Sequence, residues 1–208
     1  MPLPNGVLPT GEIHSICPSA GWLGNRGMLH DANGIIVRQW QRKAWVTCLL
    51  SYKGRNRKPL MQPGRYTELF FLDEATALAA GHRPCGECRR DDYNHFKRAW
   101  VLGNRRPDDT TIADIDKAIH DERTSNGDAA ARLHELGTLP SGVLLDWVGV
   151  PHLWTGNALL KWTPQGYVTG DAGWLRTSNV RIITPPSVVR ALAAGYVACL
   201  HKSASTAA

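Results

Sequence analysis

The sequence predicts an α+β protein built from two parts, and three observations support this class. Segments with apolar side chains at helical spacing alternate along the chain with segments rich in aromatic and β-branched residues. Tyr93, Phe96 and Trp100 are an example of the helical spacing. From residue 139 onward, short apolar runs are broken by Gly, Pro and Asn, which is typical of a small β-meander. Charged residues make up 20% of the chain and hydrophobic residues 43%, the composition of a folded globular protein.

The first part is expected to combine short strands with one short helix. Gln39–Gly54 predicts one or two strands and Thr67–Leu72 predicts another, with a loop rich in Gly, Pro and Asn between them. Asp73 suits the N-cap of a helix over Glu74–Ala80, and Gly81 suits the residue that follows its end.

The polar, proline-containing stretch NRRPDDTT (104–111) marks the expected boundary between the two parts. Before it, residues 89–102 predict a helix, and after it Ile112–Arg123 predicts a second, amphipathic one. Residues 125–137 are expected to continue as helix or loop. We therefore place one domain at residues 1–104 and a mixed helix and β-meander domain at residues 105–208.

The last element predicted is a helix over Ser187–Ala194. Two prolines occupy its first turn and Thr184 suits its cap. The final residues, 201–208, are expected to form a frayed tail.

The net charge of +6 is concentrated in one third of the chain. Residues 38–106 contain 15 Lys or Arg against 6 Asp or Glu, a net charge of +9. A cluster of this kind predicts a polyanionic partner, most commonly nucleic acid, and the alternative is a solvated basic face without a partner. Trp40 and Trp45 lie among these cations, as in surfaces that combine phosphate contacts with base stacking. The residues predicted to contact nucleic acid are Arg38, Arg42, Lys43, Lys53, Arg55, Arg57, Lys58, Arg83, Arg89 and Arg90.

The chain shows no sign of secretion or membrane insertion at the level of its sequence. Its first residues lack the basic and apolar regions of a signal peptide, and no apolar run approaches the length of a membrane span. We therefore expect a cytoplasmic protein, in which the five cysteines serve as thiols or metal ligands rather than disulfides.

The stretch HRPCGECRR contains two cysteines, Cys85 and Cys88, in the spacing of half a tetrahedral zinc site. Flanking arginines would lower the pKa values of both thiols. A redox pair is the alternative, but it is usually found after the first strand of a βαβ unit, and here a helix precedes the pair. The spacing favours zinc.

The segment ELFFLDEATALAAGHRPCGECRRD (68–91) resembles the second half of the amino-terminal zinc domain of Ada alkylation-response proteins. The resemblance extends over residues 43–92 and implies a strand, an acid-capped helix and a Cys-x-x-Cys turn in that order. It also implies that Cys48 is an upstream zinc ligand, while the position of the remaining cysteine is occupied by Tyr52. The function it implies is that of a zinc-binding, DNA-interacting protein of DNA damage repair or response.

The resemblance leaves the fourth zinc ligand to be identified. Cys17 is our first candidate, and the others are His30, His82, His95, Cys199 and His201. Three protein ligands and water would instead form an open site of the catalytic kind. In Ada-like domains a zinc-bound cysteine accepts a methyl group from a DNA phosphotriester, which would place that role at Cys48. Replacement of one thiolate by Tyr52 would make such a site less reactive.

Other polar groups admit different functions. His30 with Asp31, and His120 with Glu122, are candidate acid–base residues of a DNA glycosylase or another nucleic-acid hydrolase, although the pattern around the second pair favours a solvated helix face. GNRG (24–27), with Arg26, is either a phosphate-binding loop or a tight turn. The sequence thus leaves open whether the protein is an enzyme, and a non-catalytic regulatory module is the third alternative.

Overall fold

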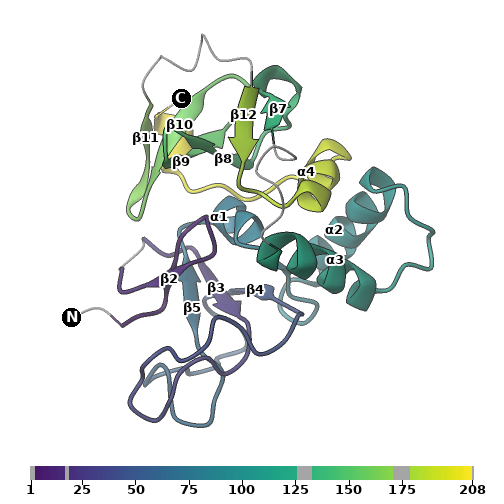
Figure 1. The fold of residues 1–208 in the computed structure, drawn as a ribbon. Helices are drawn as coiled ribbons and strands as arrows, with labels where there is room; N and C mark the ends of the chain where they lie inside the picture. The colour runs from purple at the N-terminus through teal and green to yellow at the C-terminus, as the bar shows by residue number, and fades with distance from the viewer. Residues whose placement is uncertain (1–2, 17–18, 126–132, 171–178, 208) are drawn as a thin grey trace.

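A computed structural model describes residues 3–16, 19–125, 133–170 and 179–207. It confirms the α+β class: two separate sheets are accompanied by helices that lie between and beside them (Figure 1). No helix within the described part of the chain is long and apolar enough to span a membrane.

The first sheet is formed by short strands from the N-terminal part of the chain, in the spatial order β2-β1-β5-β3-β4-β6. Strand β3 pairs antiparallel with both β4 and β5, whereas β6 joins the edge of β4 in parallel. The strands are β1 (Gly6–Val7), β2 (Ile13–His14), β3 (Trp22–Asn25), β4 (Val46–Leu49), β5 (Leu69–Phe71) and β6 (Arg83–Pro84).

The second sheet contains the predicted meander. Strands β8 to β11 follow one another as antiparallel neighbours, and β12 and β7 extend the sheet beyond β8. The strands are β7 (Leu133–Glu135), β8 (Val143–Trp147), β9 (Val150–Trp154), β10 (Leu159–Thr163), β11 (Gly166–Thr169) and β12 (Asn179–Ile182). Strand β7 corrects our expectation of helix or loop at residues 133–135 and is followed by a 3-10 helix at Leu136–Thr138, while residues 126–132 of that prediction lie outside the described residues.

The helices connect the two sheets. Helix α2 packs against α4 and more lightly against α3, so contacts cross the loop at 104–111 that we predicted as a domain boundary. The helices are α1 (Glu74–Ala79), α2 (Arg90–Gly103), α3 (Ile112–Thr124), α4 (Pro186–Ala193) and α5 (Ser203–Thr206).

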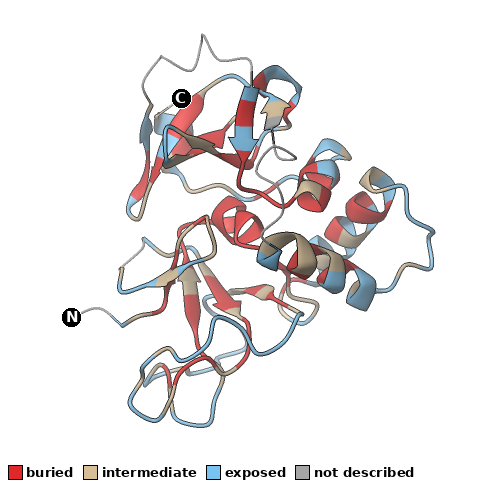
Figure 2. Cartoon of the chain, viewed as in Figure 1, coloured by how far each residue is buried: buried red, intermediate tan, exposed pale blue. Residues whose placement is uncertain are grey.

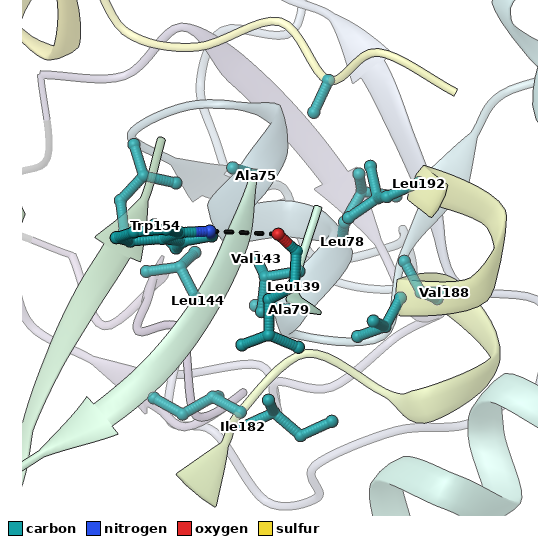
Figure 3. Packing of buried hydrophobic residues seen from close by; sticks show 14 of the residues in the cluster. Ala75, Leu78, Ala79, Leu139, Val143, Leu144, Trp154, Ile182, Val188 and Leu192 are labelled. Atoms are coloured by element: carbon teal, nitrogen blue, oxygen red, sulfur yellow. Dashed lines mark hydrogen bonds between the residues drawn. The ribbon is translucent and has the colours of Figure 1, made fainter. Parts of the chain in front are cut away.

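Helix α1 lies between the two sheets, and every one of its residues is buried (Figures 1 and 2). Ala75, Leu78 and Ala79 pack into the main core with residues of β8, β12 and α4 (Figure 3). Ala77, on the other side of the helix, packs with Leu69 and other residues of the first sheet. Small side chains on both sides therefore allow a single helix to fit between two sheets.

The start of α1 is as predicted, because the Asp73 carboxylate accepts the Thr76 amide at 2.8 Å. The same carboxylate accepts the Tyr167 hydroxyl at 2.8 Å and the His201 amide at 3.1 Å. Burial raises the pKa of Asp73, while the hydrogen bonds from Thr76 and the other donors oppose that shift. Asp73 therefore joins α1 to the second sheet and to the C-terminal segment.

The C-terminal segment is not a frayed tail. Residues 203–206 form α5, Ala204 is buried, and the Ser203 hydroxyl accepts the Tyr167 amide at 2.7 Å. The expectation for residues 201–208 was wrong over the described residues 201–207, because the partners of this segment lie on β11 and at the start of α1.

Helix α4 begins close to its predicted position but is capped differently. Its N-cap residue is Pro185, and the Thr184 hydroxyl accepts the Leu144 amide of β8. The carboxylate of Glu122 instead accepts both the amide and the hydroxyl of Ser187, at 3.0 and 2.7 Å. An acceptor from α3 thus satisfies the first turn of α4.

Candidate metal centre

Cys48, Cys85 and Cys88 come from two distant segments that the first sheet brings together. Cys48 lies on β4, and β6 leads directly into Cys85, whose amide donates to the Thr47 carbonyl at 2.9 Å. Cys88 follows in the turn before α2. The three sulfur atoms all lie within 4.8 Å of one another and are half-buried, so these residues can hold a metal ion.

The backbone around Cys85 favours a thiolate. The Glu87 amide donates to Cys85 Sγ at 3.4 Å, and α2 begins with its amides near the turn. The hydrogen bond from the Cys48 thiol, followed by those from the Cys88 and Glu87 amides, lowers the pKa of Cys85 to about 5.

The other two thiols hold their protons more tightly. The hydrogen bond to Cys85, with burial, raises the pKa of Cys48, and burial raises that of Cys88. Three sulfur atoms so close together cannot all be deprotonated without strong repulsion between their negative charges. A bound divalent metal ion would offset that repulsion. Sulfur ligands in this number suit zinc.

A small cavity of about 130 Å³ adjoins the three cysteines. Tyr52 lies at its wall, with its hydroxyl donating to the Glu87 carbonyl at 3.2 Å. Arg57 donates to the Leu50 carbonyl at 2.7 Å, while its buried Nε has no hydrogen-bond partner among the described residues. The cavity is lined by Leu23, Asn25, Val46, Cys48, Tyr52, Arg55, Arg57, Tyr66, Cys85, Glu87 and Cys88.

No fourth His, Cys, Asp or Glu joins the cluster within the part of the chain that the structure describes. Cys17, our first candidate, lies outside the described residues. His82 accepts a hydrogen bond from Arg26 at 3.2 Å, and the ring of His95 faces Tyr196. Cys199 is exposed, and His201 hydrogen-bonds Ser203 at 2.8 Å.

The predicted nucleic-acid contacts fall into three groups by their burial. Arg83 pairs with Asp116 at 2.8 Å and Arg89 pairs with Glu74 at 2.7 Å, and both arginines are buried. Arg57 is half-buried beside the cysteines. The remaining seven are exposed, mostly on the loops that are largely pale blue in Figure 2: Arg38, Arg42, Lys43, Lys53, Arg55, Lys58 and Arg90.

The four candidate acid–base residues have separate surroundings. His30 hydrogen-bonds the Thr67 hydroxyl at 2.6 Å. The Asp31 carboxylate accepts two backbone amides of its own turn. The His120 ring contacts the rings of Trp40 and Trp45 edge-on, and Glu122 binds Ser187 as described above. These contacts do not join them in one cluster.

GNRG does not form a separate tight turn: Gly24 and Asn25 are the last two residues of β3, and the chain bends at Gly27. Gly27 has a φ of +106°, and its amide donates to the side chain of Asn25 at 2.8 Å. Arg26 points inward and is 1% exposed, which the sequence did not indicate.

Comparisons with known proteins return no match: no family model, no curated protein and no solved structure is similar to this chain at a significant level.

Proposed function

We propose that this protein binds Zn²⁺ through Cys48, Cys85 and Cys88 and contacts DNA through the basic loops beside the site, in DNA damage repair or response. The observation that carries the proposal is the approach of three sulfur atoms to within 4.8 Å of one another from two distant segments. A chance grouping of three thiols at a sheet edge and a helix start is a weaker explanation than a metal site.

The three sulfur atoms account for most of a zinc coordination shell. Structural zinc sites are normally closed by four protein ligands, whereas an open position admits water or a substrate group. Here the cavity lined by Tyr52 and Arg57 adjoins the cysteines and favours an open fourth position. A bound zinc would keep the thiolates deprotonated and hence nucleophilic.

The DNA contact is supported by the position of the exposed cations. Lys53, Arg55 and Lys58 lie on the loop that follows Cys48, and Arg38 and Arg42 lie on the segment before β4. Phosphate contacts of this kind depend on lysine and arginine side chains that are open to solvent. Trp40 is 40% exposed beside them and offers a ring for base stacking.

The order of elements around the cysteines also supports the Ada-like interpretation. Strand β5, the Asp73-capped helix α1, the Cys85-x-x-Cys88 turn and helix α2 follow one another as the resemblance implies. Tyr52 lines the cavity beside the three sulfur atoms, where the resemblance would place a fourth cysteine.

The proposal is tested by fluorescence anisotropy with a labelled DNA duplex and with the matching single strand, on zinc-loaded protein at several salt concentrations. We expect the affinity to fall steeply between about 50 and 200 mM salt, because several phosphate contacts release counterions. Binding that does not change with salt, or no binding to either DNA, would contradict the DNA part of the proposal and leave the metal part standing.

A further inference from the structure

A second site lies around Arg26, in a cavity of about 320 Å³ between the N-terminal segment, the loop before β4 and the end of α3. None of the described residues that line it also lines the cavity beside the three cysteines, so it is separate from the candidate metal centre. Its lining residues are Thr10, Gly11, Glu12, Arg26, Gln39, Trp40, Trp45, Arg123 and Thr124.

Arg26 is a buried cation without an acidic partner among the described residues. Its guanidinium lies 4.2 Å from the centre of the Trp45 ring, and its Nη1 donates to the Gly11 carbonyl at 2.9 Å. Its Nε donates to the neutral ring of His82. A buried charge held only by neutral groups is costly, and an anion would offset that cost.

Two buried polar atoms of residues that line this cavity have no hydrogen-bond partner in the described part of the chain. They are Nη2 of Arg26 and the hydroxyl oxygen of Thr10. Buried polar atoms are nearly always hydrogen-bonded in folded proteins, so these two atoms are available to bind a polar group of a ligand or water.

Arg123 brings a second guanidinium to the same place. Its Nη1 donates to the Ile183 and Ala79 carbonyls at 3.1 and 3.4 Å, which fix its position. Burial, followed by the charge of Arg123, lowers the pKa of Arg26 to about 9, so Arg26 remains charged at neutral pH. A methyl group built on Gly11 would lie 3.5 Å from Arg123 Nε and 3.8 Å from Arg26 Nη2, so both guanidinium groups border the space beside this glycine.

The mouth of the cavity carries an aromatic ring and an acidic side chain. Trp40 lines it and is 40% exposed, and its indole packs edge-on against His120 at 4.5 Å. Glu12, the one acidic side chain among the described residues that line the cavity, is 67% exposed and hydrogen-bonded to His14. The cavity therefore pairs two cations with an accessible aromatic ring, and its negative charge lies at the rim.

We propose that this cavity binds a phosphate monoester attached to a planar ring, the chemistry of a nucleotide, with the phosphate at Arg26, Arg123 and Thr10 and the ring on Trp40. The volume agrees with a ligand of this size, since small-molecule sites start near 300 Å³. The ligand is either a free nucleotide or the phosphorylated end of a nucleic-acid strand.

Calorimetry on the zinc-loaded full chain tests the site with adenosine 5′-monophosphate, adenosine and inorganic phosphate. We expect the monophosphate to bind more tightly than either fragment. A 5′-phosphorylated oligonucleotide, compared with its 5′-hydroxyl counterpart, then identifies the source: a preference for the phosphorylated strand over the mononucleotide assigns the site to a strand end. Equal binding of adenosine and its monophosphate, or no binding of any phosphorylated probe, would overturn the proposal and leave a water-filled cavity only.

Three variants test which residues of the cavity contact the monophosphate. Thr10→Val keeps the side-chain shape and should weaken the monophosphate about three- to tenfold by loss of one hydrogen bond. Trp40→Ala should weaken it at least about fivefold through loss of stacking. Arg26→Gln should weaken it further, and the first two variants keep the test valid if Arg26→Gln fails to fold.

The matched controls are Thr206→Val on α5 and Arg98→Gln on α2, both exposed and outside the cavity. Both controls should bind as the unmodified protein does. Unchanged affinity in Thr10→Val and Trp40→Ala would overturn the assignment even if the monophosphate binds elsewhere.

Discussion

Arg89 and Glu74 form a buried ion pair, with Arg89 Nη2 2.7 Å from Glu74 Oε1 and neither side chain more than 2% exposed. Arg89 directly follows Cys88, and Glu74 is the first residue of α1. Glu74 also accepts the Tyr196 hydroxyl at 2.5 Å and the Cys199 amide at 2.9 Å. One carboxylate therefore joins the cysteine turn, α1 and the C-terminal segment.

Glu74→Gln should lower the free energy of unfolding by about 3 kcal/mol, because it leaves the buried Arg89 without its main counter-charge. Urea denaturation of the zinc-loaded protein measures this loss. Glu87→Gln is the control, since Glu87 pairs with Arg55 on the surface and should change stability by less than about 1 kcal/mol. Equal losses in the two variants would show that the buried pair has no special role.

Tyr52→Cys should convert the three-cysteine cluster into a closed four-thiolate site. Tyr52 lines the cavity beside the three sulfur atoms, so a thiol at this position has a short path to a bound metal. Zinc transfer to a chromogenic chelator should become slower than in the unmodified protein. Tyr52→Phe, which removes only the hydroxyl that donates to Glu87, should not slow it, and a similar rate in all three proteins would argue against an open position next to Tyr52.

The burial of His82 predicts that the protein loses stability in mild acid. Burial, followed by the charge of Arg26, holds the pKa of His82 well below its usual 6.5. As the pH drops through 6.5, His82 therefore binds a proton in the unfolded chain but not in the folded chain. The free energy of unfolding falls over this range as a result. One such histidine accounts for about 1 kcal/mol between pH 7.5 and pH 5.5.

His82→Phe isolates this contribution. Between pH 7.5 and pH 5.5 the free energy of unfolding should fall by about 1 kcal/mol less in the variant than in the unmodified protein. This difference does not depend on the stability of the variant at neutral pH. Urea denaturation at both pH values checks it, and zinc binding and the other histidines affect both proteins alike. Identical losses in the two proteins would mean that His82 is protonated in the folded state.

Removing exposed cations should change the salt dependence of DNA binding as well as the affinity. The triple variant Lys53→Ala, Arg55→Ala and Lys58→Ala should reduce the slope of log K against log salt by up to about 0.9 for each duplex phosphate that it no longer neutralises. Lys161→Ala, an exposed position on β10 of the second sheet, is the control. A slope that the triple variant leaves unchanged would remove this loop from the DNA interface.

Local signals in the sequence predicted much of the fold. The N-cap at Asp73, the positive φ of Gly81 and the buried face of α3 each depend on residues a few positions apart, and all three are present. The strand expected over 39–54 is confined to β4, and β1 to β3 were not predicted. These strands are two to four residues long and are defined by pairing with distant segments rather than by their own pattern.

Long-range contacts explain what the sequence did not indicate. Glu122 caps α4 from 65 residues away, and the amide of His201 binds Asp73 from 128 residues away. Counting charges along the sequence wrongly included Arg83 and Arg89 in the basic surface. A sequence does not show which cations pair with a buried carboxylate. Within the metal centre the Cys-x-x-Cys pair was visible by its spacing, whereas Cys48 was indicated only by the resemblance.

The metal content of the purified protein tests the central claim most directly. We predict one zinc per chain in the unmodified protein and in Cys199→Ser, whose thiol is exposed and outside the cluster, and loss of zinc in Cys48→Ser and in Cys85→Ser. Zinc retained in Cys17→Ala would agree with an open fourth position, and its loss there would identify Cys17 as the fourth ligand. An unmodified protein without zinc, or a Cys85→Ser variant that retains it fully, would contradict the account.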